Sequence, residues 1–157
     1  MFTLTGINND RGFTMFSSRP RSAESVLKPL REIPMFAGLS NSVLSKFDSL
    51  MVELALDAGA RLTTEGERGR EAFIVAEGVA QVLVDGQVVG TVGSGDVVGE
   101  LALLSGGTRT ATVVAVTDMR VYVLDPREFS ELLSDAHTAE WITSAAAGRL
   151  RELDAAS

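Results

Sequence analysis

The chain has 157 residues, of which 45% are hydrophobic, and its formal net charge is −7. This length suits one domain with short additions, and the acidic balance argues against a general nucleic-acid surface, which needs clustered lysine and arginine. Cysteine is absent, which excludes disulfides, iron–sulfur ligation and thiol catalysis. Because no run nears the ~20 apolar residues of a membrane span and no secretory signal pattern is present, we expect a cytoplasmic protein without a membrane contact.

The N-terminal part is predicted to contain a tail followed by two helical pieces. Residues 1–24 are polar and show no sustained hydrophobic period, so we expect a flexible tail or an arm that orders on a partner. Pro29 and Pro34 limit the first helical piece. Ser40 or Ser42 can then cap a helix whose apolar positions recur at intervals of three and four: Val43, Leu44, Phe47, Leu50 and Met51.

A β-rich module is expected over about residues 58–125. After Asp57 the hydrophobic period falls to two and glycines recur at short intervals. The Asp85-Gly86 pair between two apolar runs is a strong signal for a two-residue hairpin turn. Many short antiparallel strands with tight turns indicate a jelly roll or a barrel. The expected strands are 61–64, 72–77, 79–84, 87–92, 110–116 and 119–124.

Two helices are predicted to close the chain, over about residues 126–154. Pro126 suits a helix start, and the pattern indicates a short helix over 128–133 and a long one over 139–153. The long helix has an apolar face of period near 3.6, at Trp141, Ile142, Ala145, Ala146, Leu150 and Leu153. Such a face can pack on the domain or form a homodimer contact.

Residues 95–115, GDVVGELALLSGGTRTATVVA, carry the groups best suited to hold an anionic ligand. Gly99 and Glu100 open a turn of good helix formers, whose free N–H groups and dipole attract anions. Nine positions after Glu100, Arg109 can donate two hydrogen bonds to phosphate oxygens. Ionised Glu100 only accepts hydrogen bonds and therefore suits ribose hydroxyls. The alternative for this pair is a surface ion pair of little energetic value.

This segment resembles the phosphate-binding cassette of the cyclic-nucleotide-binding domain family, seen in catabolite-activator-type regulators, cyclic-nucleotide-dependent kinase subunits and cyclic-nucleotide-gated channels. The resemblance rests on GELALL, a glycine-containing loop and RTATV at the family's carboxylate-to-arginine spacing. It implies that Glu100 takes the ribose 2′-hydroxyl and that Arg109 takes an equatorial phosphate oxygen. Backbone N–H groups would complete the phosphate cradle at Leu101, Ala102, Thr110 and Ala111.

The resemblance extends over about residues 30–153 and implies the fold. We predict a mainly β protein with flanking helices: a double-stranded β-helix, or jelly roll, with an N-terminal helical element and C-terminal helices. The domain would occupy residues 25–157. Val82, Val89 and Gly90 line up with family positions near the base or ribose, although valines can simply be core residues.

Thr110 leaves two nucleotides open as the ligand. A threonine directly after the arginine resembles relatives that prefer cyclic GMP, whereas bacterial relatives with a small hydroxyl residue there often respond to cyclic AMP. We favour cyclic AMP, with cyclic GMP as the alternative. Trp141 is expected either to cap the base or to pack in a helix or dimer seam.

We expect no catalytic residue, metal or further cofactor. His137 is the single histidine, which cannot supply the two or three histidines of a cupin metal site, and no activating base accompanies Arg109. The leading hypothesis is a stand-alone regulatory module that senses the nucleotide and signals an unknown effector protein through its C-terminal helices. The alternatives are a truncated sensor domain of a transcription regulator, without direct DNA binding here, and a ligand-free scaffold that dimerises through the C-terminal helix.

Overall fold

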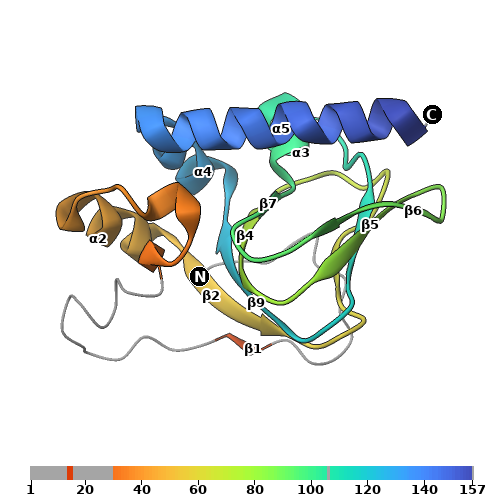
Figure 1. Ribbon diagram of the computed structural model, residues 1–157, viewed down its shortest axis with the longest axis horizontal. Coiled ribbons are helices and arrows are strands. Elements are labelled where there is room, and N and C mark those ends of the chain that lie inside the picture. The colour runs from red at the N-terminus through yellow and green to blue at the C-terminus, as the bar shows by residue number, and fades with distance from the viewer. Residues whose placement is uncertain (1–13, 16–29, 106, 157) are drawn as a thin grey trace.

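Two antiparallel sheets form the centre of the computed structural model, which describes residues 14–15, 30–105 and 107–156 (Figure 1). One sheet has the strand order β1-β2-β9-β4-β7 and the other has the order β3-β8-β5-β6. The first contains β1 (Thr14–Met15), β2 (Val52–Leu56), β9 (Met119–Leu124), β4 (Ala72–Glu77) and β7 (Val97–Val98). The second contains β3 (Arg61–Thr63), β8 (Thr112–Ala115), β5 (Ala80–Val84) and β6 (Gln87–Val92). The predicted jelly roll with flanking helices is confirmed.

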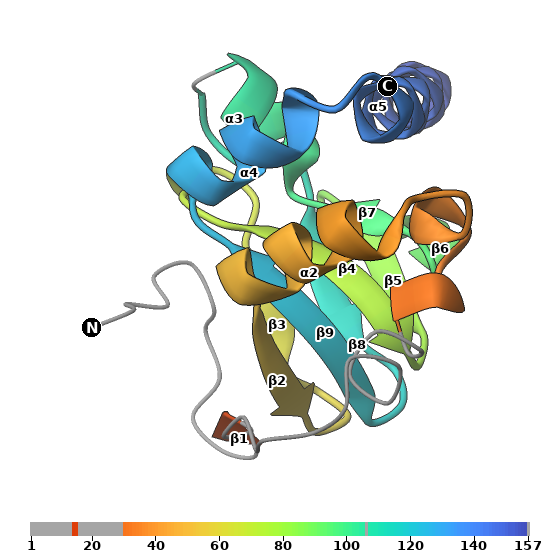
Figure 2. The ribbon, with the colours of Figure 1, turned by 90° about the vertical axis from the view of Figure 1, so that its left-hand side faces the viewer.

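Helices cover one end of the two sheets (Figures 1 and 2). The 3-10 helix η1 (Pro34–Phe36) and α2 (Asn41–Leu50) precede the main sheets, α3 (Glu100–Ser105) follows β7, and α4 (Pro126–Leu133) and α5 (Ala136–Ala156) follow β9. In Figure 1, α5 runs across this end, and it packs against α3, α4, β6 and η1. Among the described helices, none is long and apolar enough to cross a membrane.

The helix starts follow from local capping chemistry. The Ser40 side chain accepts a hydrogen bond from the N–H of Val43, which satisfies one of the free donors at the start of α2. At the start of α4, Asp125 and Glu128 form a reciprocal capping box, with Pro126 in the first turn. The N-cap residue is therefore Ser40 for α2 and Asp125, one residue before Pro126, for α4.

The hairpin between β5 and β6 confirms the turn expected at Asp85-Gly86. Both residues have positive φ, 51° for Asp85 and 79° for Gly86. Two successive positive φ values produce the type I′ turn that matches the twist of paired strands. Val84 pairs with Gln87 directly across this turn.

Strand β9 separates two hydrophobic cores. Val121 and Val123 pack into the core between the sheets, whereas Tyr122 and Leu124 pack into the core beneath the helices. Successive side chains of a strand point to opposite faces, so both faces of β9 are buried. The phenyl rings of Phe36 and Phe47, 5.9 Å apart, belong to the core beneath the helices.

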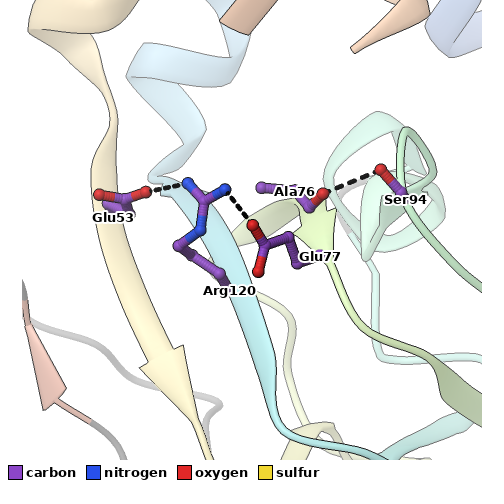
Figure 3. Close-up of polar contacts among 5 residues, drawn as sticks. All are labelled: Glu53, Ala76, Glu77, Ser94 and Arg120. Carbon is purple, nitrogen blue, oxygen red and sulfur yellow. Dashed lines mark hydrogen bonds and ion pairs between the residues drawn. The ribbon is translucent and has the colours of Figure 1, made fainter. Parts of the chain in front are cut away.

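An ion-pair network links three neighbouring strands of the first sheet (Figure 3). Arg120 on β9 contacts Glu53 on β2 and lies 2.8 Å from the Glu77 carboxylate on β4. Nearby, the Ser94 hydroxyl donates to the carbonyl of Ala76 at 2.8 Å. The ion pairs of Arg120 join β2, β9 and β4, and none of these residues lines the pocket described below.

The structure differs from the sequence expectations at three boundaries. The roll begins with β2 at Val52, earlier than residue 58, and β2 pairs along its whole length with β9. The strand expected over 110–116 starts only at Thr112. Within the expected tail, Thr14 and Met15 pair with Ala55 and Leu54, and the rest of residues 1–24 lies outside the described residues.

Candidate functional site

A pocket lies between α3 and β8 and contains the predicted carboxylate and arginine. Glu100 is the first residue of α3, and Arg109 precedes β8. Six of the predicted site residues line this pocket: Gly99, Glu100, Ala102, Arg109, Thr110 and Ala111. The remaining lining residues are Thr63, Val98 and Val113. The pocket therefore combines one negative and one positive side chain with two threonines and small or aliphatic residues.

Glu100 and Arg109 are both buried. Their exposed fractions are 1% and 4%, so they do not form the solvated surface pair that the sequence left open. Burial lowers the pKa of Arg109, and the negative charges of Glu71, Glu100 and Glu67 oppose that shift. Arginine stays protonated in proteins, so the pocket holds a fixed cation in a dry setting. A buried cation of this kind attracts an anion more strongly than a surface arginine does.

The guanidinium of Arg109 is held by main-chain carbonyl groups. Its Nη1 donates to the carbonyl of Gly99 at 3.2 Å, and its Nη2 donates to the carbonyl of Glu71 at 2.8 Å. The third guanidinium nitrogen, Nε, has no hydrogen-bond partner among the described residues. A buried N–H without a partner is costly, and an incoming acceptor would satisfy it.

Residues 66–71, which we call the clamp loop, also hold the backbone of Arg109. The N–H of Arg109 donates to the carbonyl of Glu67 at 2.7 Å, and the carbonyl of Arg109 accepts from the N–H of Gly66 at 2.9 Å. A Cβ on Gly69 would lie 2.6 Å from the Cβ of Ala102 and 3.0 Å from Cζ of Arg109. The loop therefore packs directly on the pocket wall, and only glycine fits at position 69.

Sequence reasoning missed the clamp loop and Thr63. The loop contacts Arg109 mainly through carbonyl groups, which every residue type carries. In the sequence, therefore, only its glycines could have indicated a close contact with another part of the chain. Thr63 is buried on β3, lines the pocket and donates from its hydroxyl to the carbonyl of Ala111 at 3.0 Å. Its inward position in a short strand could have marked it as a pocket residue.

The residues expected near the base lie close to the pocket wall but do not line the pocket. Val82 is fully buried and pairs with Gly90 on one side and with Val113, a lining residue, on the other. Val89 is half-buried against the same core. Thr110 is exposed and lines the pocket, whereas Trp141 on α5 is 42% exposed and does not line it. The side chain of Leu101 lies outside the description.

Three residue types that commonly act in catalysis or metal binding are missing from the described lining of this pocket. The described lining residues include no histidine, lysine or cysteine. Across residues 14–15, 30–105 and 107–156, no three His, Cys, Asp or Glu side chains group as a metal site requires. The arrangement is suited to holding an anion beside a hydroxyl-bearing group.

Comparison with known proteins identifies the family. Residues 53–136, more than half of the chain, match the model of the cyclic nucleotide-binding domain. The chain belongs to the cyclic nucleotide-binding domain family.

Two curated relatives and one solved structure illustrate the similarity. A cGMP-dependent protein kinase of Caenorhabditis elegans is 41% identical over 91 residues, covering 58% of this chain and 12% of the kinase. A cAMP-dependent protein kinase regulatory subunit of Mycosarcoma maydis is 38% identical over 115 residues, covering 68% of this chain and 22% of the subunit. The chain thus spans less than a quarter of either relative.

The solved structure is a PKAR CBD2 domain bound to Sp-2Cl-cAMPS. It superposes with a TM-score of 0.74 at 25% identity, covering 84% of this chain and 89% of that one. Here the likeness extends over nearly the whole of both chains.

Proposed function

We propose that this domain binds a cyclic nucleotide in the pocket between α3 and β8, with cyclic AMP favoured over cyclic GMP. The observation that carries the proposal is the buried guanidinium of Arg109, 4% exposed, whose Nε has no hydrogen-bond partner among the described residues. The phosphate would accept from this guanidinium, and the ribose 2′-hydroxyl would donate to Glu100. Family membership and both curated relatives support a ligand of this class.

The preference for cyclic AMP depends on groups near the base. Thr110 is exposed at the pocket edge, where its hydroxyl can meet a base. Val82, Val89 and Gly90 would support the ribose or base from the neighbouring β5–β6 hairpin. The relatives include proteins named for each nucleotide, so a direct comparison of the two ligands decides the preference.

We further propose that α5 transmits binding to an effector protein. α5 packs against α3, which carries Glu100, and against β6. A ligand that binds one position of α5 more tightly than another shifts the population toward that position. The exposed part of α5, including Trp141, would then present a different surface to the effector or to a second copy of the chain.

Isothermal titration with cyclic AMP, cyclic GMP and adenosine tests the binding proposal. Both cyclic nucleotides should bind, cyclic AMP more tightly, and adenosine should bind weakly because it lacks the phosphate that Arg109 attracts. Arg109→Ala should abolish the difference between cyclic AMP and adenosine. Arg127→Ala, which removes an exposed arginine from α4, is the matched control. No heat with either cyclic nucleotide at millimolar concentration would contradict the proposal.

The binding role also predicts that the nucleotide is not turned over. No histidine or lysine lines the described pocket to activate a water or a hydroxyl. Cyclic AMP recovered after long incubation with the protein should therefore be unchanged by chromatography. Formation of the linear monophosphate would instead reveal a hydrolase.

A further inference from the structure

We propose that Glu65 is a positioning residue for the pocket: it holds the end of the β5–β6 hairpin in place and thereby raises the affinity for the nucleotide. The inference rests on the proposed function, because this hairpin carries the residues proposed to support the ribose or base. Glu65 lies between β3 and the clamp loop. It is half-buried and is not among the described residues that line the pocket, so it acts through the hairpin and not on the ligand.

The end of the β5–β6 hairpin extends past the strand beside it. β5 pairs with β8 up to Leu83, which lies opposite Thr112, the first residue of β8. Because the two strands are antiparallel, the hairpin residues after Leu83 continue toward the chain that precedes Thr112. That chain contains Thr110 and Ala111, which line the pocket. The other hairpin strand, β6, is the last of its sheet, so the turn of the hairpin lies beyond the pairing with β8.

Glu65 connects this turn to the start of β8. Its Oε1 accepts a hydrogen bond from the N–H of Asp85 at 3.0 Å, and its own N–H donates to Oγ1 of Thr112 at 3.0 Å. The turn itself leaves the Asp85 N–H free, because a β-turn is closed by the N–H of its fourth residue, here Gln87. One residue therefore contacts both the hairpin turn and the strand that the turn extends past.

The same stretch of chain also holds the backbone of the pocket arginine. Gly66, the residue after Glu65, donates its N–H to the carbonyl of Arg109 at 2.9 Å. Consecutive N–H groups thus fix the segment from Arg109 to Thr112, while the Glu65 carboxylate fixes the hairpin. When a binding position is occupied only part of the time, the apparent affinity falls by that fraction. Loss of the Glu65 carboxylate should therefore weaken binding by releasing the hairpin.

Hydrogen exchange of the Asp85 amide, followed by NMR in the protein without ligand, tests the contact itself. In Glu65→Ala this amide should exchange about three- to tenfold faster, as expected for one lost hydrogen bond. Glu65→Gln keeps an acceptor oxygen at the same distance along the side chain and should exchange like the unchanged protein. Equal exchange in the alanine variant would overturn the inference.

Titration calorimetry with cyclic AMP tests the effect on the pocket. Glu65→Ala should bind about three- to tenfold more weakly, and Glu65→Gln should restore the affinity. Asp85→Gly keeps the N–H that donates and tolerates the φ of 51° at this position, so it should bind like the unchanged protein. Thr112→Val removes the hydroxyl that holds the Glu65 backbone and should also weaken binding. Combined with Glu65→Ala, its effect should be smaller than the product of the two, because both changes release the same contact.

Ser40→Ala controls for a general loss of stability. It removes the N-cap of α2, and Ser40 is not among the described residues that line the pocket. This variant should melt at a lower temperature and still bind cyclic AMP like the unchanged protein. Thermal melting of every variant without ligand ensures that the titrations are made on folded protein.

The outcomes separate this inference from the proposed function. If the unchanged protein binds cyclic AMP and Glu65→Ala binds it equally well, or Glu65→Gln binds it as weakly as Glu65→Ala, the inference is overturned and the proposed function stands. If the unchanged protein binds no cyclic nucleotide, the proposed function fails and the inference fails with it.

Discussion

The guanidinium of Arg109 lies directly on the backbone of Gly99. Nη1 of Arg109 donates to the Gly99 carbonyl at 3.2 Å, and a Cβ on Gly99 would lie only 2.5 Å from the same nitrogen. Gly99 also has a φ of +88°, which residues with a Cβ rarely adopt. The residue before α3 is thus restricted to glycine both by its backbone conformation and by the arginine beside it.

We predict that Gly99→Ala lowers the affinity for cyclic AMP. The positive φ costs about 1–2 kcal/mol of stability, and the added methyl also displaces Arg109. Gly59→Ala is the matched control, because Gly59 has a φ of +93° but no atom within 4 Å of the added Cβ. Both variants should melt at lower temperature, and calorimetry should show weaker binding for Gly99→Ala alone. Equal affinities would mean that Arg109 does not depend on Gly99.

Arg109→Lys should bind cyclic AMP at least about tenfold more weakly than the unchanged protein, since a lost charge-assisted hydrogen bond is worth about 1.5–3 kcal/mol. Lysine keeps the charge but lacks the planar fork that donates to Gly99 and Glu71 together. Titration of both proteins with cyclic AMP and adenosine measures this effect. An affinity retained by lysine would show that charge alone attracts the phosphate.

Trp141 offers a direct test of movement in α5, because it is the single tryptophan of the chain and is 42% exposed. We expect cyclic AMP to change its emission or its quenching by acrylamide, with the same concentration dependence as binding. Arg109→Ala should show no change at those concentrations. Binding by calorimetry with constant tryptophan fluorescence and quenching would contradict transmission through this part of α5.

Tyr122 is the single tyrosine, and burial raises its pKa to about 12 from an ordinary value of 10.0. A raised pKa in the folded state means that the stability contributed by the neutral phenol is complete below pH 10 and is lost as the pH rises toward 12. The tyrosinate absorbance should titrate near 12 in the folded protein and near 10 in denaturant.

Tyr122→Phe is the control for this titration. This variant has no phenol to titrate. Its melting temperature should therefore fall less between pH 10 and 12 than that of the unchanged protein. A phenol that titrates near 10 in the folded protein would place Tyr122 in a solvated position instead of the core beneath the helices.

Asp125→Ala should destabilise the domain by about 1 kcal/mol, because the Asp125 side chain accepts from the N–H of Glu128 at the start of α4. For a domain of this size, that corresponds to about 2–4 °C in melting temperature. Asp125→Asn, which can still cap the helix, should lose less. An unchanged melting temperature for the alanine variant would show that α4 does not need this cap.

The pairing of Glu100 and Arg109 in one pocket could be predicted from sequence because its signals are local. Glu100 and Arg109 are nine residues apart in one continuous segment, and the turn at Asp85-Gly86 is specified by the two residues that form it. Such features depend on residue type and spacing, which a single sequence displays.

The clamp loop and β2 could not be predicted in the same way. Arg109 is held by the carbonyls of Glu67 and Glu71, about forty residues earlier, and a carbonyl leaves no trace in residue type. β2 starts at Val52. The apolar residue Leu50 ends α2 and the apolar cap residue Met51 follows it, so the sequence shows no break in hydrophobicity between the helix and the strand. The assignment of β2 depends on pairing with β9, which is a long-range contact.

The position of β9 between two cores affects how the domain unfolds. Because Val121 and Val123 complete one core while Tyr122 and Leu124 complete the other, neither core can lose this strand alone. The helical layer and the β-roll therefore open as one cooperative unit, and amide hydrogen exchange should be slowest along β9. The helix movement proposed above would have to occur without opening this shared strand.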